Sequence, residues 1–272
     1  MKNLDNIKII FIDIDRTLLN DKGHITMKTR KSIKRVVDKG IYVVLASGRN
    51  CSFCVDKSKR ALASNIVISS NGAEIYDYEN KKMLYSNFID KSKLEEIWEF
   101  CNKKEIGIIF NTTNDRYINK YLIGNDKYKT KLITSFKELN KVNVSQFVIV
   151  SDDYNKIYES KKKIKSLDLD IAYFSKSFED DIIVKKGSLD GINKNVSKGS
   201  GVLELLKILK LKKSNSLCFG DYLNDLEMME SAYHSYAMEN AHEDLKKVSR
   251  FITHKNNDED GVMHQIKEVI GL

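Results

Sequence analysis

Two carboxylates separated by one residue follow a short apolar run near the start of the chain. Asp13 and Asp15 come directly after residues 7–12, whose pattern favours a strand buried on both faces. Because side chains two apart on a strand point the same way, we expect both carboxylates to converge at its carboxyl end. One could attack phosphorus while the other donates and then accepts a proton. Thr17 adds a hydroxyl group; the alternative is an acidic pair that only caps the next turn.

Groups suited to holding a phosphate follow or precede two further segments. Ser47 and Gly48 follow the apolar run at 41–46, and a hydroxyl beside a glycine N–H can contact phosphate oxygens. Lys198 precedes an apolar helical segment at 199–210, and its ammonium could neutralise a phosphate at a helix N-terminus that also favours anions. The plain alternatives are an ordinary strand-to-helix turn and one exposed lysine among many.

A second group of polar residues follows the apolar run at 216–219. Asp221 can supply a hard oxygen ligand for Mg²⁺. Asp225 can orient the residues of the site without itself binding the ion. Asn224 can donate to a phosphate oxygen. With Glu227, three residues later, it could also form a capping box at the start of the next helix. The two roles of Asn224 are compatible.

These candidate residues lie at the ends of short apolar strands that alternate with helices. That alternation predicts an α/β fold, a doubly wound parallel sheet that binds ligands at the carboxyl ends of its strands. The middle of the chain has another pattern and predicts a separate α+β unit at 83–190. The elements expected there are a helix around 94–101, strands at 106–110 and 117–122, a helix at 127–139, a strand at 146–150, a helix at 155–167, and strands at 169–174 and 181–184.

The composition excludes several classes of protein. Apolar residues make up 42% and charged residues 31% of the 272 positions, which suits a folded globular chain and not a disordered one. No apolar run reaches the length of about 18 residues that predicts a membrane-spanning helix. The N-terminus lacks the pattern of a secretory signal. We therefore expect a cytoplasmic protein with no membrane partner.

The basic net charge of +8 does not by itself indicate a nucleic-acid partner. The lysines are spread along the chain, and no nucleic-acid-binding motif is recognisable, so we expect no such partner. A positive field would instead help to gather a small anionic substrate. Cys51 and Cys54 form a lone C-x-x-C without the second pair that a zinc site needs, which leaves reduced thiols or a redox pair.

The order and spacing of these motifs resemble the haloacid dehalogenase (HAD) superfamily, specifically its Cof-type phosphatases with an inserted α+β cap of type IIB. The resemblance covers nearly the whole chain. It rests on Asp13-x-Asp15-x-Thr17, Ser47-Gly48-Arg49, Asn71-Gly72-Ala73, Lys198-Gly199, Gly220-Asp221-x-x-Asn224-Asp225, Met238-x-Asn240-Ala241 and Asp260-Gly261-Val262. It implies a HAD-like Rossmannoid core formed by residues 1–82 and 191–272, with 83–190 as a cap that selects the substrate.

The resemblance also implies a role for each candidate residue. Asp13 would be the nucleophile, forming an aspartyl-phosphate, and would also bind Mg²⁺. Asp15 would be the general acid and base, and its backbone carbonyl would bind Mg²⁺. Asp221 would be the third metal ligand, supported by Asp225. The residues that would hold the substrate and its phosphoryl group are Thr17, Ser47, Gly48, Lys198 and Asn224.

One position departs from the pattern of that family. The family usually has glycine between the second aspartate and the threonine, where this chain has Arg16. No catalytic group is lost, but the turn must tolerate a Cβ atom. The guanidinium could also add positive charge near the phosphate.

The implied function is Mg²⁺-dependent hydrolysis of small phosphomonoesters, such as sugar phosphates or related metabolites, by a monomer or homodimer. A phosphomutase or phosphotransferase shares the aspartyl-phosphate and is a first alternative. A non-enzymatic regulatory protein on the same scaffold is a second. The presence of the nucleophile and of the metal ligands argues against the second alternative.

Overall fold

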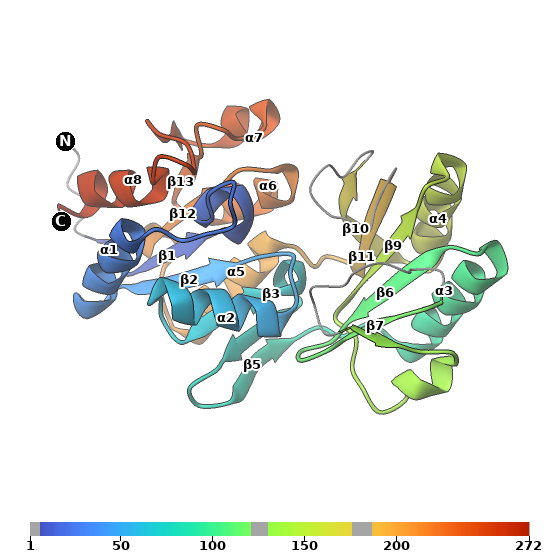
Figure 1. The fold of residues 1–272 in the computed structure, drawn as a ribbon. Helices are drawn as coiled ribbons and strands as arrows, with labels where there is room; N and C mark the ends of the chain where they lie inside the picture. Colours follow the sequence, from blue (N-terminus) through green and yellow to red (C-terminus); the bar gives the residue numbers. More distant parts are fainter. Residues whose placement is uncertain (1–5, 121–129, 176–186, 272) are drawn as a thin grey trace. The chain divides into compact units, whose positions relative to one another are not determined.

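The chain divides into two compact units. The structure, a computed structural model, describes residues 6–120, 130–175 and 187–271 (Figure 1). One unit comprises Met1–Tyr85 and Ser197–Leu272, and the other comprises Ser86–Val196. The boundaries predicted from the sequence, after residues 82 and 190, lie a few residues before these.

The first unit is built on an eight-stranded sheet in the order β14-β13-β12-β1-β2-β3-β4-β5. Neighbouring strands from β14 to β3 are parallel, and β4 is antiparallel to β3. The strands are β1 (Ile9–Ile12), β2 (Tyr42–Ala46), β3 (Ile66–Ser69), β4 (Glu74–Asp77), β5 (Lys82–Ser86), β12 (Ser216–Gly220), β13 (His234–Ala237) and β14 (Phe251–Ile252). The α/β sheet predicted from the sequence is confirmed.

Helices cover the faces of this sheet. They are α1 (Met27–Asp38), α2 (Cys51–Ala61), α5 (Lys198–Ile208), α6 (Leu226–Ser231), α7 (Glu243–Val248) and α8 (Gly261–Ile270). Helix α1 packs against α2 and α8, whereas α5 packs against α6, which in turn contacts α7. All four residues of β1 are buried, as expected for a central strand of a parallel sheet that is covered on both faces.

The second unit contains a six-stranded sheet in the order β10-β11-β9-β6-β7-β8. Its elements are α3 (Lys91–Lys104), β6 (Gly107–Asn111), β7 (Arg116–Ile118), β8 (Thr130–Leu132), β9 (Gln146–Ser151), α4 (Tyr154–Ser166), β10 (Leu169–Ser175) and β11 (Gly187–Asn193). Helix α3 buries the four side chains whose spacing predicted an amphipathic helix: Leu94, Ile97, Trp98 and Cys101. They join a core that includes Phe110 and Phe147.

The helix predicted at 127–139 is wrong for the part that the structure describes. Thr130–Leu132 instead forms a strand that pairs in parallel with Arg116–Ile118. Only Phe136–Leu139 makes a helical turn, which begins where the Ser135 side chain accepts a hydrogen bond from the Lys137 N–H. Pairing with a distant strand overrides the local helical pattern here. The predicted strand at 181–184 and the end of the one at 117–122 lie outside the described residues.

Across the described ranges, we find no helix that combines the length and the apolar character needed to cross a membrane.

Candidate active site

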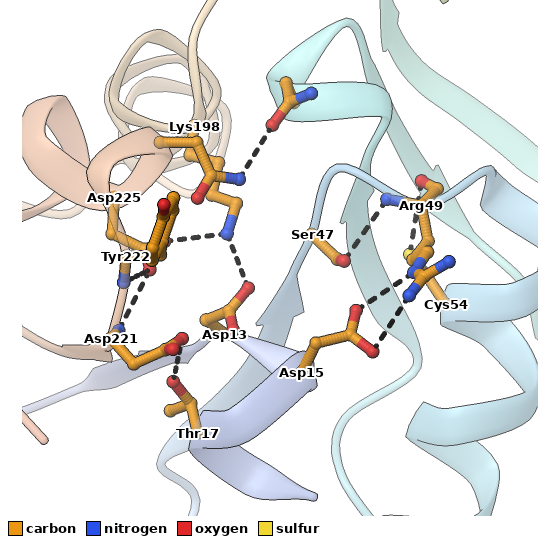
Figure 2. A network of polar contacts seen from close by, with 12 residues as sticks. Asp13, Asp15, Thr17, Ser47, Arg49, Cys54, Lys198, Asp221, Tyr222 and Asp225 are labelled. Carbon is orange, nitrogen blue, oxygen red and sulfur yellow. Dashed lines mark hydrogen bonds and ion pairs between the residues drawn. The ribbon is translucent and has the colours of Figure 1, made fainter. Parts of the chain in front are cut away.

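Three parallel strands deliver candidate side chains to one edge of the first sheet. The last residue of β1 pairs with a residue near the end of β2 on one side and of β12 on the other. Asp13 follows β1 directly, Ser47 follows β2, and Asp221 follows β12. The Asp13 N–H donates to the carbonyl of Phe219 at 3.0 Å, which ties the residue to the neighbouring strand. The shared strand-end position thus places these side chains close together (Figure 2).

Lys198 lies at the centre of this group. It is the first residue of α5, yet its side chain is only 1% exposed. Its Nζ lies 2.5 Å from Asp13 Oδ1 and 2.7 Å from Asp225 Oδ1 (Figure 2). Burial disfavours the charged ammonium, but the two carboxylates outweigh burial and raise the pKa of Lys198. The alternative that Lys198 is an exposed surface lysine is therefore wrong.

Asp225 is fully buried, and both of its oxygens already have partners. Oδ1 accepts from Lys198, and Oδ2 accepts from the backbone N–H groups of Asp221 at 3.1 Å and Tyr222 at 3.2 Å. A Cβ on Gly220 would lie 2.7 Å from this carboxylate, so glycine is needed for the close approach. Asp225 therefore holds Lys198 and the 221–222 backbone in place.

Asp221 and Asp13 are buried carboxylates whose charge is only partly balanced. Burial first, and then Asp225, raises the pKa of Asp221 to about 7, although Thr17 Oγ1 donates to Asp221 Oδ1 at 3.0 Å. Burial also raises the pKa of Asp13, against the opposing charge of Lys198. Three carboxylates and one ammonium leave a formal charge of −2 in a buried place, which favours either proton uptake or a divalent cation.

The donor atoms fit such a cation. One oxygen each of Asp13, Asp221 and Asp225 lies within 4.8 Å of the others. Carboxylate oxygens are the ligands that Mg²⁺ prefers in proteins. Because the oxygens of Asp225 are engaged by Lys198 and by backbone N–H groups, Asp13 and Asp221 are the side chains that can offer oxygens without losing those bonds.

Asp15 faces a different cation. The Arg49 Nε lies 3.0 Å from Asp15 Oδ2, and Nη2 lies 3.3 Å from Oδ1 (Figure 2). Both side chains are about two-fifths exposed, at 41% for Asp15 and 38% for Arg49. The Arg49 N–H also donates to Ser47 Oγ at 3.2 Å. Asp13 and Asp15 thus reach the same edge of the sheet, but each carboxylate has its own cationic partner.

Small polar groups form the other side of the site. Asn224 Nδ2 donates to Asn71 Oδ1 at 3.2 Å. A Cβ on Gly48 would lie 3.0 Å from the Asn71 carboxamide, so the glycine allows this contact. The capping box considered for Asn224 with Glu227 is not formed, because α6 begins after Asp225 without a side-chain cap. Asn224 is held by another loop of the site instead.

Two glycines fix the start of α5 and hence Lys198. Gly72 has φ +96°, and a Cβ there would lie 2.0 Å from the carbonyl oxygen of Ser197. A Cβ on Gly199 would lie 2.3 Å from the carbonyl oxygen of Glu227. Only glycine permits these approaches, so the loop after β3 and helix α6 set where the lysine enters the site.

Sequence reasoning missed three residues of this region. Arg49, Asn71 and Asn240 stood in motifs that we noted, but none of them received a role. Arg49 pairs with Asp15, and Asn71 accepts from Asn224. Asn240 Nδ2 donates to the carbonyl of Arg16 at 2.9 Å, from a position 224 residues away in the chain. Their place inside spaced motifs was the signal that could have identified them.

The redox alternative for the C-x-x-C segment has no support in its surroundings. Cys51 and Cys54 lie in the first turn of α2, where both thiols are buried and free. Burial, followed by the charge of Glu74, raises the pKa of Cys51 to about 12. The thiolate is the reactive form of cysteine, so these thiols are held in their unreactive state.

The eight-stranded sheet, with acidic, basic and glycine residues gathered at its carboxyl edge, is typical of one class of hydrolase. The chain belongs to the haloacid dehalogenase-like hydrolases, whose family pattern matches residues 10–266. Within that family it is a Cof-type phosphatase, an enzyme that acts on phosphoric monoesters.

Individual relatives agree with this assignment. The chain is 30% identical to 5-amino-6-(5-phospho-D-ribitylamino)uracil phosphatase YcsE of Bacillus subtilis, over 96% of this chain and 95% of the relative. A haloacid dehalogenase-like hydrolase from Bacteroides thetaiotaomicron has a similar fold, with a TM-score of 0.83 and 24% identity over 97% of this chain and 99% of that one. A sugar phosphatase of HAD subclass IIB follows with a TM-score of 0.78 and 22% identity, over 96% and 98% of the two chains. These two likenesses concern the fold alone.

Proposed function

We propose that the chain is a Mg²⁺-dependent phosphatase that hydrolyses small phosphomonoesters through an aspartyl-phosphate on Asp13. The observation that carries this proposal is the buried contact of Lys198 with both Asp13 and Asp225, beside the carboxylate of Asp221. A nucleophilic carboxylate and an anionic phosphate repel each other, so the site must supply positive charge. A buried ammonium 2.5 Å from the attacking carboxylate supplies part of it.

The contacts support the following roles for the individual residues. Asp13 would attack phosphorus with the oxygen that Lys198 does not hold. Asp13 Oδ, the backbone carbonyl of Asp15 and Asp221 Oδ would hold the Mg²⁺, which supplies charge neutralisation for the transferring phosphoryl group. Asp15 would protonate the leaving oxygen and then deprotonate the water that attacks the aspartyl-phosphate. Asp15 has to share or leave its ion pair with Arg49 to do so.

The phosphoryl oxygens need donors from the protein. We assign donation to the phosphoryl oxygens to Lys198, Ser47 Oγ, the backbone N–H of Gly48 and Asn224 Nδ2. The loops that carry the last three groups lie at the same edge of the sheet as Asp13. Thr17 would act through Asp221, to which its hydroxyl donates. Donors held in place before the reaction stabilise the developing charge without reorganisation.

The substrate class is a small phosphorylated metabolite such as a sugar or polyol phosphate. The relative from Bacillus subtilis is named for a phosphomonoester on a ribityl chain, which fits this class. We assign the choice of leaving group to the second unit, Ser86–Val196, as a cap. A phosphomutase or phosphotransferase remains the alternative, since it would use the same aspartyl-phosphate.

The test compares the wild type with Asp13→Asn and with Asp38→Asn, an exposed aspartate on α1. We expect Mg²⁺-dependent hydrolysis of p-nitrophenyl phosphate by the wild type and by Asp38→Asn, and none by Asp13→Asn. Wild-type turnover in Asp13→Asn would overturn the nucleophile assignment. A panel of phosphorylated metabolites then separates the alternatives, because a phosphatase releases inorganic phosphate while a mutase retains it on the sugar.

A further inference from the structure

Arg16 has an unusual backbone conformation within the proposed site. It lies between Asp15 and Thr17, and its φ and ψ are 57° and 8°. This left-handed region is unfavourable for a residue with a Cβ atom. Such conformations persist only where the surroundings impose them, and they cluster at functional sites.

Residues from the end of the chain impose this conformation. Asn240 Nδ2 donates to the carbonyl of Arg16 at 2.9 Å, and Asn240 Oδ1 accepts from the N–H of Asn257 at 3.1 Å. Asn257 Nδ2 in turn donates to the carbonyl of Leu19 at 3.1 Å and to Asp21 Oδ1 at 2.9 Å. The carboxamides of Asn240 and Asn257 thus hold both sides of the turn, and they fix the backbone position from which the Arg16 side chain extends.

The guanidinium of Arg16 differs from the other cations of the site. Lys198 contacts two carboxylates and Arg49 contacts one. Arg16, in contrast, is exposed and makes no side-chain hydrogen bond or ion pair within the described ranges. Its backbone nevertheless belongs to the turn between Asp15 and Thr17, at the edge of the sheet where the candidate residues gather.

We propose that Arg16 binds a second anionic group of the substrate, a carboxylate or a second phosphate carried by the leaving group. This inference rests on the proposed function. The transferring phosphoryl group already has the buried Lys198 and the donors of the neighbouring loops. The exposed guanidinium of Arg16, on the same turn as Asp15, is left for another anion. Its planar fork matches carboxylate and phosphate oxygens in pairs. The enzyme should then prefer phosphomonoesters that carry a second negative charge.

The experiment uses two compounds that differ by one carboxylate, 3-phosphoglycerate and glycerol 3-phosphate, with Mg²⁺. The variants are Arg16→Asn, which keeps the backbone because asparagine tolerates the left-handed region, and Arg16→Lys, which keeps the charge. Arg35→Gln removes one exposed arginine charge from α1 and serves as the matched control. The measured quantity is kcat/KM for 3-phosphoglycerate divided by kcat/KM for glycerol 3-phosphate.

We expect this ratio to exceed one in the wild type and to fall by about tenfold in Arg16→Asn, in keeping with the loss of a charge-assisted hydrogen-bonded pair. It should fall less in Arg16→Lys and stay unchanged in Arg35→Gln. A ratio that Arg16→Asn leaves unchanged overturns the proposal. So does an equal loss for both compounds, since Arg16 would then contact the transferring phosphoryl group.

A binding measurement separates this proposal from the proposed function. Calorimetry compares the affinity of the two compounds for Asp13→Asn and for Asp13→Asn/Arg16→Asn. If the wild type hydrolyses neither compound, a preference for 3-phosphoglycerate that Arg16→Asn removes still supports the role of Arg16, while the proposed phosphatase reaction fails for these compounds. The absence of any such preference in binding overturns the role of Arg16.

Discussion

Arg49 holds both carboxylate oxygens of Asp15, with Nε 3.0 Å from Oδ2 and Nη2 3.3 Å from Oδ1. The pair joins the loop after β2 to the turn after β1. It sets the direction in which the proposed acid and base points before any substrate is present. Arg49 in turn lies over the ring of Phe53, 5.5 Å from its centroid, so the guanidinium is itself supported.

Replacing Arg49 should therefore reduce turnover without unfolding the protein. We expect Arg49→Gln to lower kcat by about tenfold, because a proton-transfer group loses its orientation. The pair is partly exposed, so the free energy of unfolding should change by less than about 1 kcal/mol. Steady-state kinetics and urea denaturation measure the two quantities. Arg60→Gln, which removes an exposed ion pair with Asp56 on the same helix, should change neither.

Removing the buried lysine should destabilise the metal-free protein strongly. Lys198→Met leaves Asp13 and Asp225 buried without their cation, which typically costs about 3–5 kcal/mol. Urea denaturation in EDTA at pH 8 measures this loss. Lys207→Met, on the exposed face of the same helix, is the control. Adding Asp225→Asn to Lys198→Met should recover part of the free energy of unfolding, because one of the two unpaired carboxylates is removed. A double variant that is no more stable than Lys198→Met alone would contradict this explanation.

The stabilisation by Mg²⁺ should depend on pH. The pKa of Asp221 is raised to about 7 in the folded protein from an ordinary value of 3.8, so the folded form binds the extra proton. That contribution to stability is fully present below about pH 4 and is lost as the pH rises through about 7. Mg²⁺ binds the deprotonated carboxylate and offsets this loss.

The rise in Tm caused by Mg²⁺ should consequently be larger at pH 8 than at pH 6. Thermal denaturation with and without the ion, at matched ionic strength, provides the measurement. Asp221→Asn should abolish both the rise and its dependence on pH. An equal rise at both pH values in the wild type would show that Asp221 does not bind the ion.

The strain at Arg16 should be measurable as stability. A left-handed conformation costs a residue other than glycine roughly 1–2 kcal/mol, so Arg16→Gly should raise the free energy of unfolding by about 1 kcal/mol. Asn240→Ala should lower it by about 1 kcal/mol, since the hydrogen bond to the Arg16 carbonyl is lost. In the Arg16→Gly background the cost of Asn240→Ala should shrink, because glycine adopts this conformation unaided. Additive effects would contradict the coupling.

The parts of the fold that the sequence predicted are those governed by local pattern. The runs of apolar residues at 7–12, 41–46 and 216–219 are long enough to predict buried strands, and the geometry of a parallel sheet then places the residue after each strand at one common edge. The helix predicted at 127–139 failed because Thr130–Leu132 pairs with a strand whose position the local pattern does not contain.

The contacts within the site were harder to predict because they join distant segments. Lys198 is 185 positions from Asp13 and Asn240 is 224 from Arg16, so neither burial nor partner can be read locally. The sequence singles out Lys198 as a candidate phosphate-binding residue but does not show that its side chain is buried. Its identity as the buried cation follows only once Gly72 and Gly199 are seen to bring the start of α5 against the sheet.

The sheet order has a consequence for how the chain folds while it is being synthesised. Strand β1 lies between β2 and β12, but β12 begins only at Ser216, after the whole second unit has been made. At about 5–20 residues per second, the nascent chain carries β1 with one open edge for roughly 10–40 s. An open edge of four buried apolar residues is prone to pair with other chains. The edge of the central strand therefore stays exposed to other chains until Ser216–Gly220 has been synthesised, and faster translation would shorten that exposure.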